Sequence, residues 1–313
     1  MELVSPKPGI VSIGECMIEF SRTTAQGEVW LQRYGGDTLN TAVYLSRLGE
    51  AVAYLTALGE DPYSGQMRHG WAAEGIDTSL VLTKSDRLPG LYMIQTNVQG
   101  ERSFHYWRQN SAVRALFECD GVELALKRAE DAGLLYLTGI TLSLFNRAGR
   151  ERLVDLCRKV RAKGGQVAFD PNYRARGWPA PEDAHGAFAA IASQVDFALP
   201  TFEDEVVLHG DRSPQDCLYR WASWGAAEVV IKLGAEGALA GGPGGAVAIT
   251  TQADPWPRDT TGAGDGFNAG YLSARRRGEP PAAAAGRGNQ LAGAVVKHAG
   301  AIIPRSAMPV VAP

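Results

Sequence analysis

The residues best suited to chemistry lie in the segment Asp259-Thr-Thr-Gly-Ala-Gly-Asp265-Gly-Phe-Asn-Ala-Gly270-Tyr-Leu. Glycines at positions 262 and 264 let backbone N–H groups approach an anion closely. The apolar positions that follow predict a helix of small residues beginning near Asp265. An isolated aspartate in a first helical turn is usually a stabilising cap, worth about 0.5–2 kcal/mol. A solvent-facing cap does not need glycine on both sides, so the pattern favours a phosphoryl-transfer site with Asp265 as a base.

The elements that must position this segment alternate between short apolar runs and helical patterns. Strand, helix, strand is the opening pattern, and its repetition predicts an α/β fold with a doubly wound, mainly parallel sheet and helices on both faces. The expected strands are 10–13, 52–56, 134–137, 167–169, 197–199 and 229–232, and the expected helices include 39–48, 149–162 and 184–192.

Two stretches, at about 15–34 and 90–108, break this alternation. Residues 91–97 and 102–107 resemble hairpin strands that flank a turn at 99–101. Strands inserted away from the parallel sheet would form a small antiparallel sheet beside it. We expect the whole chain, 1–313, to form a single domain.

Composition narrows the function classes. The chain has 313 residues, of which 45% are hydrophobic and 21% charged, with a formal net charge of −3. This mildly acidic balance argues against a nucleic-acid partner, and we expect no membrane association because no apolar run approaches a membrane span. The N-terminus lacks the features of a targeting segment, which predicts a cytoplasmic protein. Four scattered cysteines predict buried free thiols.

Two separated motifs resemble the signatures of the PfkB, or ribokinase-like, carbohydrate kinases. One is the glycine-rich segment that ends at Asp265, and the other is Tyr34-Gly-Gly-Asp-Thr-Leu-Asn-Thr-Ala-Val-Tyr-Leu-Ser-Arg-Leu-Gly49, followed by Gly59-Glu-Asp61. The resemblance covers the whole chain. It implies an ATP- and Mg²⁺-dependent kinase with a ribokinase-like fold, in which the small sheet is a lid over the sugar. It also implies that Asp265 is the base and that the turn at Gly262 presents the N–H groups of Ala263, Gly264 and Asp265 as an anion hole.

The same resemblance assigns residues to the nucleotide and to metal ions. Lys232-Leu-Gly234-Ala-Glu-Gly237 is similar to the family's turn beneath the phosphates, although such turns are common and are often only structural. Asn289 resembles the asparagine of the adenine wall. Thr201 replaces the asparagine of a family motif near magnesium, so either Asp204 or Glu205 would serve as its acidic partner. A solvated acidic helix start is the alternative for these acids.

The resemblance also implies residues that would bind a monovalent cation and residues that would bind the sugar. Asp259 and Thr261 border a monovalent-cation site in many relatives, which raises the hypothesis of potassium activation. Gly35, Gly36 and Asp37 would bind sugar hydroxyls at a helix start, with Asn40 one turn later.

The substrate end resembles the branch of the family that phosphorylates 2-keto-3-deoxygluconate at its C6 hydroxyl. Tyr92 lies in Pro89-Gly-Leu-Tyr92, and Tyr106 and Arg108 lie in Tyr106-Trp-Arg108, where alternate residues of a strand share a face. Arg174 lies in Asp170-Pro-Asn-Tyr-Arg174. A guanidinium can grip a carboxylate in two places, so the two arginines would hold the acid group. Solubilising arginines and aromatic packing within the sheet are the alternatives.

Several alternatives stay open at this stage. A fructokinase or a ribokinase would share the catalytic residues. A kinase for 2-keto-3-deoxygalactonate would act on a substrate that differs from 2-keto-3-deoxygluconate only in the configuration of one hydroxyl. A nucleotide-binding protein without kinase activity would belong to another class, but neither a dinucleotide fingerprint nor a P-loop motif is present. By resemblance to the family we expect a homo-oligomer, with a dimer as the first choice.

Overall fold

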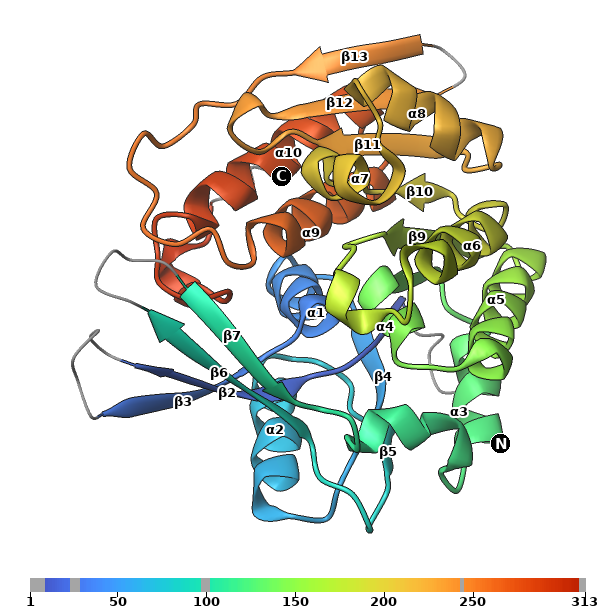
Figure 1. The fold of residues 1–313 in the computed structure, drawn as a ribbon, viewed down its shortest axis with the longest axis vertical. Helices are drawn as coiled ribbons and strands as arrows, with labels where there is room; N and C mark the ends of the chain where they lie inside the picture. Colours follow the sequence, from blue (N-terminus) through green and yellow to red (C-terminus); the bar gives the residue numbers. More distant parts are fainter. Residues whose placement is uncertain (1–8, 23–28, 97–101, 243–244, 310–313) are drawn as a thin grey trace.

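The computed structural model describes residues 9–22, 29–96, 102–242 and 245–309, and a nine-stranded sheet forms its centre (Figure 1). The strand order is β13-β12-β11-β10-β9-β8-β1-β4-β5, and all neighbours pair in parallel except the last two pairs at the β13 edge. The strands are β1 (Ile10–Ile13), β4 (Val52–Leu58), β5 (Val81–Thr83), β8 (Leu134–Thr138), β9 (Gln166–Asp170), β10 (Phe197–Ala198), β11 (Glu228–Lys232), β12 (Ala238–Gly242) and β13 (Gly245–Ile249). The predicted doubly wound α/β fold is therefore confirmed.

Helices cover both faces of this sheet (Figure 1). One face packs against α1 (Asp37–Arg47), α2 (Pro62–Ala73), α9 (Ala263–Arg276) and α10 (Pro281–Val295), and the other against α3 (Val122–Ala129), α4 (Gly139–Ser143), α5 (Arg147–Ala162), α6 (Pro181–Ala192), α7 (Phe202–His209) and α8 (Pro214–Ser223). Strand residues divide between the two cores by alternation, since Ile10 belongs to one core and Val11 to the other. Within the described ranges, no helix has the combined length and apolar character of a membrane span.

A second sheet of four strands projects to one side of the main sheet (Figure 1). Its order is β3-β2-β6-β7, from β2 (Met17–Arg22), β3 (Trp30–Gly35), β6 (Gly90–Thr96) and β7 (Arg102–Trp107). Two antiparallel hairpins form it, and their inner strands β2 and β6 pair in parallel. The turn predicted at 99–101 lies outside the described residues. We call this four-stranded sheet the lid.

The four cysteines, at positions 16, 119, 157 and 217, are free and buried, as predicted. Burial raises the pKa of the Cys157 thiol to about 12, which keeps it protonated at neutral pH. These thiols therefore act as small apolar side chains of the core.

Candidate active site

The helix that carries Asp265 begins two residues earlier than predicted, at Ala263. Its cap, Gly262, has a φ of 77°, and a Cβ there would lie 2.7 Å from Ala301. Gly262 is therefore required by the turn and by packing. A Cβ at Gly264 would meet only the Nζ atom of Lys232, at 3.7 Å. Gly264 thus leaves open space beside a lysine, which is what close approach of an anion needs.

The first intrahelical hydrogen bond of α9 is donated by Gly266 to the carbonyl oxygen of the cap residue, at 2.9 Å. The N–H groups of Gly264 and Asp265 come before that bond and point out of the helix end. The third predicted donor, the N–H of Ala263, donates to the carbonyl oxygen of Thr260 at 3.2 Å. The helix end thus presents two donors ready for an anion and a third already in use.

Asp265 is buried at this helix end, and its Oδ2 accepts a hydrogen bond from Nδ2 of Asn40 at 2.8 Å. Burial raises its pKa to about 8, with repulsion from Asp37 and Asp170 acting in the same direction. The hydrogen bond from Asn40 and the charge of Lys232 oppose this shift. A carboxylate with a pKa near the working pH is well matched to general-base chemistry.

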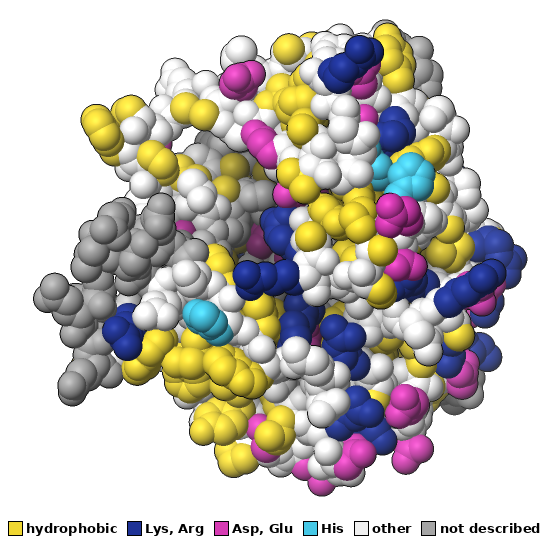
Figure 2. Space-filling model, in the orientation of Figure 1, with side chains coloured by type: hydrophobic (Ala, Val, Ile, Leu, Met, Phe, Trp, Pro, Cys, Tyr) yellow, Lys and Arg dark blue, Asp and Glu magenta, His cyan; other side chains and the backbone are white. Residues whose placement is uncertain are grey.

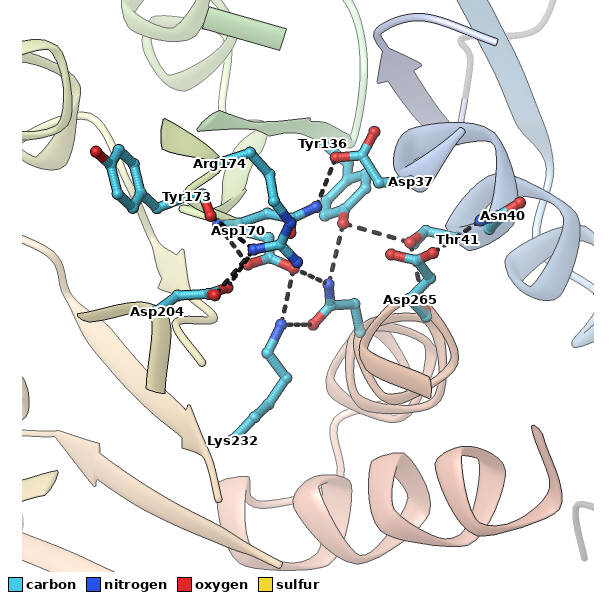
Figure 3. Close-up of polar contacts among 12 residues, drawn as sticks. Asp37, Asn40, Thr41, Tyr136, Asp170, Tyr173, Arg174, Asp204, Lys232 and Asp265 are labelled. Atoms are coloured by element: carbon cyan, nitrogen blue, oxygen red, sulfur yellow. Dashed lines mark hydrogen bonds and ion pairs between the residues drawn. The ribbon is translucent and has the colours of Figure 1, made fainter. Parts of the chain in front are cut away.

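A polar network connects Lys232 to the interior of the site (Figure 3). Its Nζ atom contacts Oδ2 of Asp170 at 2.7 Å and Oδ1 of Asn268 at 3.1 Å. Asn268 also donates from Nδ2 to Asp170 at 2.7 Å and to the hydroxyl of Tyr136 at 3.0 Å. Thr41 completes the network with a 3.3 Å bond to Tyr136. Because these polar atoms satisfy one another, the lysine is held in place without solvent.

Asp37, at the start of α1, lies on the other side of this network. Burial raises its pKa, and Asn172 donates to its Oδ2 from Nδ2 at 2.9 Å. Asn172 is the one non-glycine residue with positive φ, 34°, among those that the structure describes. The two glycines before Asp37 are enforced sterically, since a Cβ at Gly35 would lie 2.5 Å from the Tyr92 hydroxyl and one at Gly36 would lie 2.1 Å from the Glu15 carbonyl oxygen.

Arg174 lies beside Asp204 (Figure 3). Its Nη1 contacts both carboxylate oxygens of Asp204, at 2.8 and 2.9 Å, and the carbonyl oxygen of Tyr173 at 2.6 Å. Its side chain is 56% exposed, so much of the guanidinium faces open space. Thr201 precedes α7 as its cap residue and makes no side-chain cap bond.

Glu205 lies away from this group. It is fully buried, and its Oε2 accepts from Nη2 of Arg220 at 2.6 Å and from Nε1 of Trp221 at 2.9 Å. Arg220 also binds Asp211. The register of α7 therefore brings Asp204, and not Glu205, beside Arg174, while Glu205 fixes α7 to α8.

Arg108, which directly follows β7 and is partly exposed, forms an ion pair with the buried carboxylate of Glu15. The remaining predicted sugar contacts line the lid. Tyr92 is buried and donates its hydroxyl to Glu19, while Tyr106 pairs with it across the sheet and is 37% exposed.

Of the predicted nucleotide residues, Asn289 lines a cavity of about 740 Å³, together with residues 250–255 and other residues of α10. Asn289 donates to the carbonyl oxygen of Ile249 at 3.4 Å. Gly234 and Gly237 both have positive φ, 55° and 102°, and a Cβ at Gly237 would lie 2.1 Å from the same carbonyl oxygen. Gly237 is thus required by packing, whereas Gly234 is required by its backbone conformation.

The predicted cation residues Asp259 and Thr261 shape the turn before α9. Oδ1 of Asp259 accepts from the N–H of Thr261 at 2.9 Å, and its Oδ2 accepts from the N–H of Gly300 at 2.7 Å. The carboxylate thereby ties the glycine-rich turn to the segment that follows α10.

Sequence reasoning missed several polar residues of the site: Glu15, Glu19, Thr41, Tyr136, Asp170, Asn172 and Asn268. One signal was available, because Asp170 and Asn172 lie in the same segment as Arg174, directly after a predicted strand. The carboxyl ends of parallel strands are where ligand sites form in such folds.

A helix N-terminus with free donors, a buried carboxylate of raised pKa and a neighbouring cavity on a doubly wound sheet are features of phosphoryl-transfer enzymes. The family model described as pfkB family carbohydrate kinase matches residues 7–308. The chain belongs to this family.

Individual relatives agree with this placement. The chain is 42% identical to a 2-dehydro-3-deoxygluconokinase of Dickeya dadantii and 41% identical to one of Escherichia coli K12, and each match covers 96% of this chain and 98% of the relative. A solved PfkB protein from Polaromonas sp. JS666 superposes with a TM-score of 0.82 at 28% identity, covering 95% of this chain and 97% of that one.

Proposed function

We propose that this protein transfers the γ-phosphoryl group of ATP to the C6 hydroxyl of 2-keto-3-deoxygluconate, also called 2-dehydro-3-deoxygluconate, to give 2-keto-3-deoxy-6-phosphogluconate. The observation that carries the proposal is the placement of Asp265, a buried carboxyl with a pKa of about 8, at a helix end with free N–H donors. Relatives of about 40% identity over nearly the whole chain carry the corresponding name.

In this reaction Asp265 accepts the proton of the C6 hydroxyl while the hydroxyl oxygen bonds to the γ-phosphorus. The bond from that phosphorus to the β–γ bridging oxygen breaks, and ADP leaves. The N–H groups of Gly264 and Asp265 stabilise negative charge on the moving phosphoryl group, and Lys232 adds a positive charge 3.7 Å from the open position above Gly264.

The residues present fit ATP and Mg²⁺. The cavity beside Asn289 is of the size that small-molecule sites have, about 300–1,000 Å³. Thr201 pairs with Lys232 in an isolated β-bridge, and Gly234 and Gly237 lie in the turn between β11 and β12. Asp204 is our proposed ligand for Mg²⁺, and its two carboxylate oxygens accept from Arg174 in this structure. When bound, Mg²⁺ neutralises phosphate oxygens.

Arg108 and Arg174 are our proposed ligands for the substrate carboxylate, with Tyr92, Tyr106 and the turn at residues 35–37 around the sugar chain. Holding C1 at that end would place the far hydroxyl beside Asp265 and orient it for transfer. Arg174→Ala tests this assignment. Turnover of the keto acid should fall while that of a neutral ketose does not, and equal turnover by the variant and the wild type would contradict it.

A substrate screen tests the function itself. ADP release is measured with the gluconate- and galactonate-configured keto acids, fructose, ribose and no acceptor. The proposal expects release that depends on the keto acid. Preference for fructose or ribose would support the alternative sugar kinases, and absence of release with every acceptor would support a nucleotide-binding protein without kinase activity.

A cation site and a cellular location are proposed together with this function. Asp259 and Thr261 would border a K⁺ ion, and rates measured in KCl and NaCl test this directly, since equal rates exclude it. We also propose a cytoplasmic location, which fractionation of cells that express the protein would test.

We further propose a homodimer. Figure 2 shows hydrophobic side chains gathered over the lower left of the molecule, where the lid lies. Leu88 and Trp107, 62% and 57% exposed, line a shallow cavity of about 420 Å³ there. Sedimentation of the wild type should give the mass of two chains. The mass measured for Trp107→Lys should shift toward that of one chain. A monomeric wild type at high concentration would contradict the dimer.

A further inference from the structure

Glu15 occupies an unusual place for a buried carboxylate. It follows β1, an interior strand of the main sheet, and precedes β2, the first strand of the lid, so it lies in the segment that connects the two sheets. Arg108 lies in another connecting segment, between β7 of the lid and the return of the chain to the main body. Their ion pair therefore joins two of the chain crossings at the base of the lid.

The surroundings of this pair are tightly packed. A Cβ at Gly90, the first residue of β6, would lie 2.8 Å from Oε1 of Glu15 and 3.2 Å from Cβ of Arg108. Arg114 fixes the backbone there, since its Nε donates to the carbonyl oxygen of Arg108 at 3.0 Å. This packing leaves the pair little room to change its geometry.

The polar atoms of the pair are incompletely satisfied. Beyond the ion pair between Oε2 of Glu15 and Nη2 of Arg108, the buried Oε1 of Glu15 and the buried Nε of Arg108 make no hydrogen bond. The only protein anion that Arg108 contacts, in the part of the chain that the structure describes, is Glu15. A guanidinium has five N–H donors, and Nη1 of Arg108, which carries two of them, is not among these buried atoms, so it stays available to a second carboxylate.

We propose that Glu15 is a positioning residue for acid recognition: its carboxylate holds the guanidinium of Arg108 at the base of the lid, oriented toward the acid group of the substrate. Without Glu15, the long arginine side chain would adopt several rotamers and would lose the alignment on which a paired hydrogen-bond geometry depends. This inference rests on the proposed function and adds to it the residue through which Arg108 acts.

The test compares Glu15→Ala, Glu15→Gln, Arg108→Ala and the double variant Glu15→Ala/Arg108→Ala. Steady-state constants are measured with 2-keto-3-deoxygluconate and with the neutral ketose in which a hydroxymethyl group replaces the carboxylate. In Glu15→Ala we expect the KM for the keto acid to rise about tenfold, the effect of losing one well-aligned charged hydrogen bond. The KM for ATP and the constants for the neutral ketose should change less than about twofold, since no carboxylate is involved.

Glu15→Gln keeps an oxygen acceptor and should restore part of the affinity. Because Glu15 acts only through Arg108, the double variant should match Arg108→Ala, and multiplied single effects would refute the inference. Glu74→Gln is the matched control. Glu74 pairs with Arg47 at 2.7 Å outside the site, so this variant should change thermal stability and leave the KM unchanged.

Two results for Glu15→Ala would overturn the proposal. A lower KM for the keto acid would show that Glu15 competes with the substrate for Arg108, and an unchanged KM would show that Glu15 does not position Arg108. If Glu15→Ala does not fold, Glu15→Gln, which keeps an oxygen acceptor for Arg108, and the double variant, which removes both charges of the pair, carry the same comparison. A wild type that ignores the keto acid refutes the proposed function itself. This inference alone is refuted if the wild type phosphorylates the keto acid and Arg108→Ala raises the KM for it, but the Glu15 variants leave that KM unchanged.

Discussion

Replacing Asp265 with asparagine should separate catalysis from stability. Asparagine has almost the same shape and can still accept the 2.8 Å hydrogen bond from Asn40, but it does not take up a proton. Turnover should fall by about 10²–10⁴, the usual contribution of a positioned general base. The assay is ADP release at saturating ATP and keto acid.

The raised pKa of Asp265 also fixes the pH dependence of the wild type. With a pKa of about 8, the carboxyl is half ionised at pH 8, and about one tenth is ionised at pH 7. Since only the ionised form accepts a proton, kcat/KM should fall about tenfold per pH unit below pH 7 and should level off above pH 8. A flat profile between pH 6 and 8, or near-normal turnover of the asparagine variant, would refute the assignment of Asp265 as the base.

The raised pKa of Asp265 affects stability in the opposite direction from activity: activity rises with pH, whereas stability falls. The folded pKa of about 8 lies above the ordinary value of 3.8, so between these pH values the folded protein holds a proton that the unfolded chain has lost. The contribution of Asp265 to stability is thus present at acid pH and is lost as the pH rises toward 8, by at most about 1.4 kcal/mol per pH unit. Melting temperatures of wild type and Asp265→Asn should therefore diverge from pH 5 to pH 8, with the variant higher. Parallel melting curves would contradict the burial argument.

Three further substitutions test other parts of the site. Gly264→Ala should fold normally, because its Cβ meets only Lys232 at 3.7 Å, but should lose turnover by blocking the anion position; unchanged turnover would count against the anion hole. Gly262→Ala should instead lower the melting temperature, since a φ of 77° costs an alanine about 1–2 kcal/mol before its clash with Ala301, and an unchanged melting temperature would contradict this. Lys232→Met leaves Asp170 buried without its counter-ion and should lower the free energy of unfolding by about 3–5 kcal/mol in denaturant titrations; no loss would show that Asn268 suffices.

The main sheet could be predicted from sequence because its signals are local. Buried strands such as 10–13 and 134–137 read as short apolar runs, and the structure places β1 and β8 there. The helix at Asp265 was predicted two residues late because its cap, Gly262, makes a left-handed turn that apolar periodicity does not report. Local patterns thus located these elements with errors only at their ends, whereas the strands β5, β12 and β13 and the helices α2, α3 and α8 were not predicted.

The site network could not be predicted, because its contacts join distant parts of the chain. Lys232 reaches Asp170 across 62 positions, and Asn40 reaches Asp265 across 225. Nothing in the segment around Glu15 indicates that it faces Arg108, since that contact depends on how the lid joins the main sheet. The choice between Asp204 and Glu205 likewise depended on the register of α7, which sets the neighbouring acids about 100° apart around the helix.

The most direct test of the central claim is a product analysis with wild-type protein, Mg²⁺, ATP and 2-keto-3-deoxygluconate. Phosphorus NMR of the product should show one phosphate ester, coupled to the C6 methylene protons, formed in equal amount to ADP. ADP release without that ester, or an ester formed only on neutral sugars, would contradict the account of a carboxylate-anchored acceptor whose far hydroxyl meets Asp265.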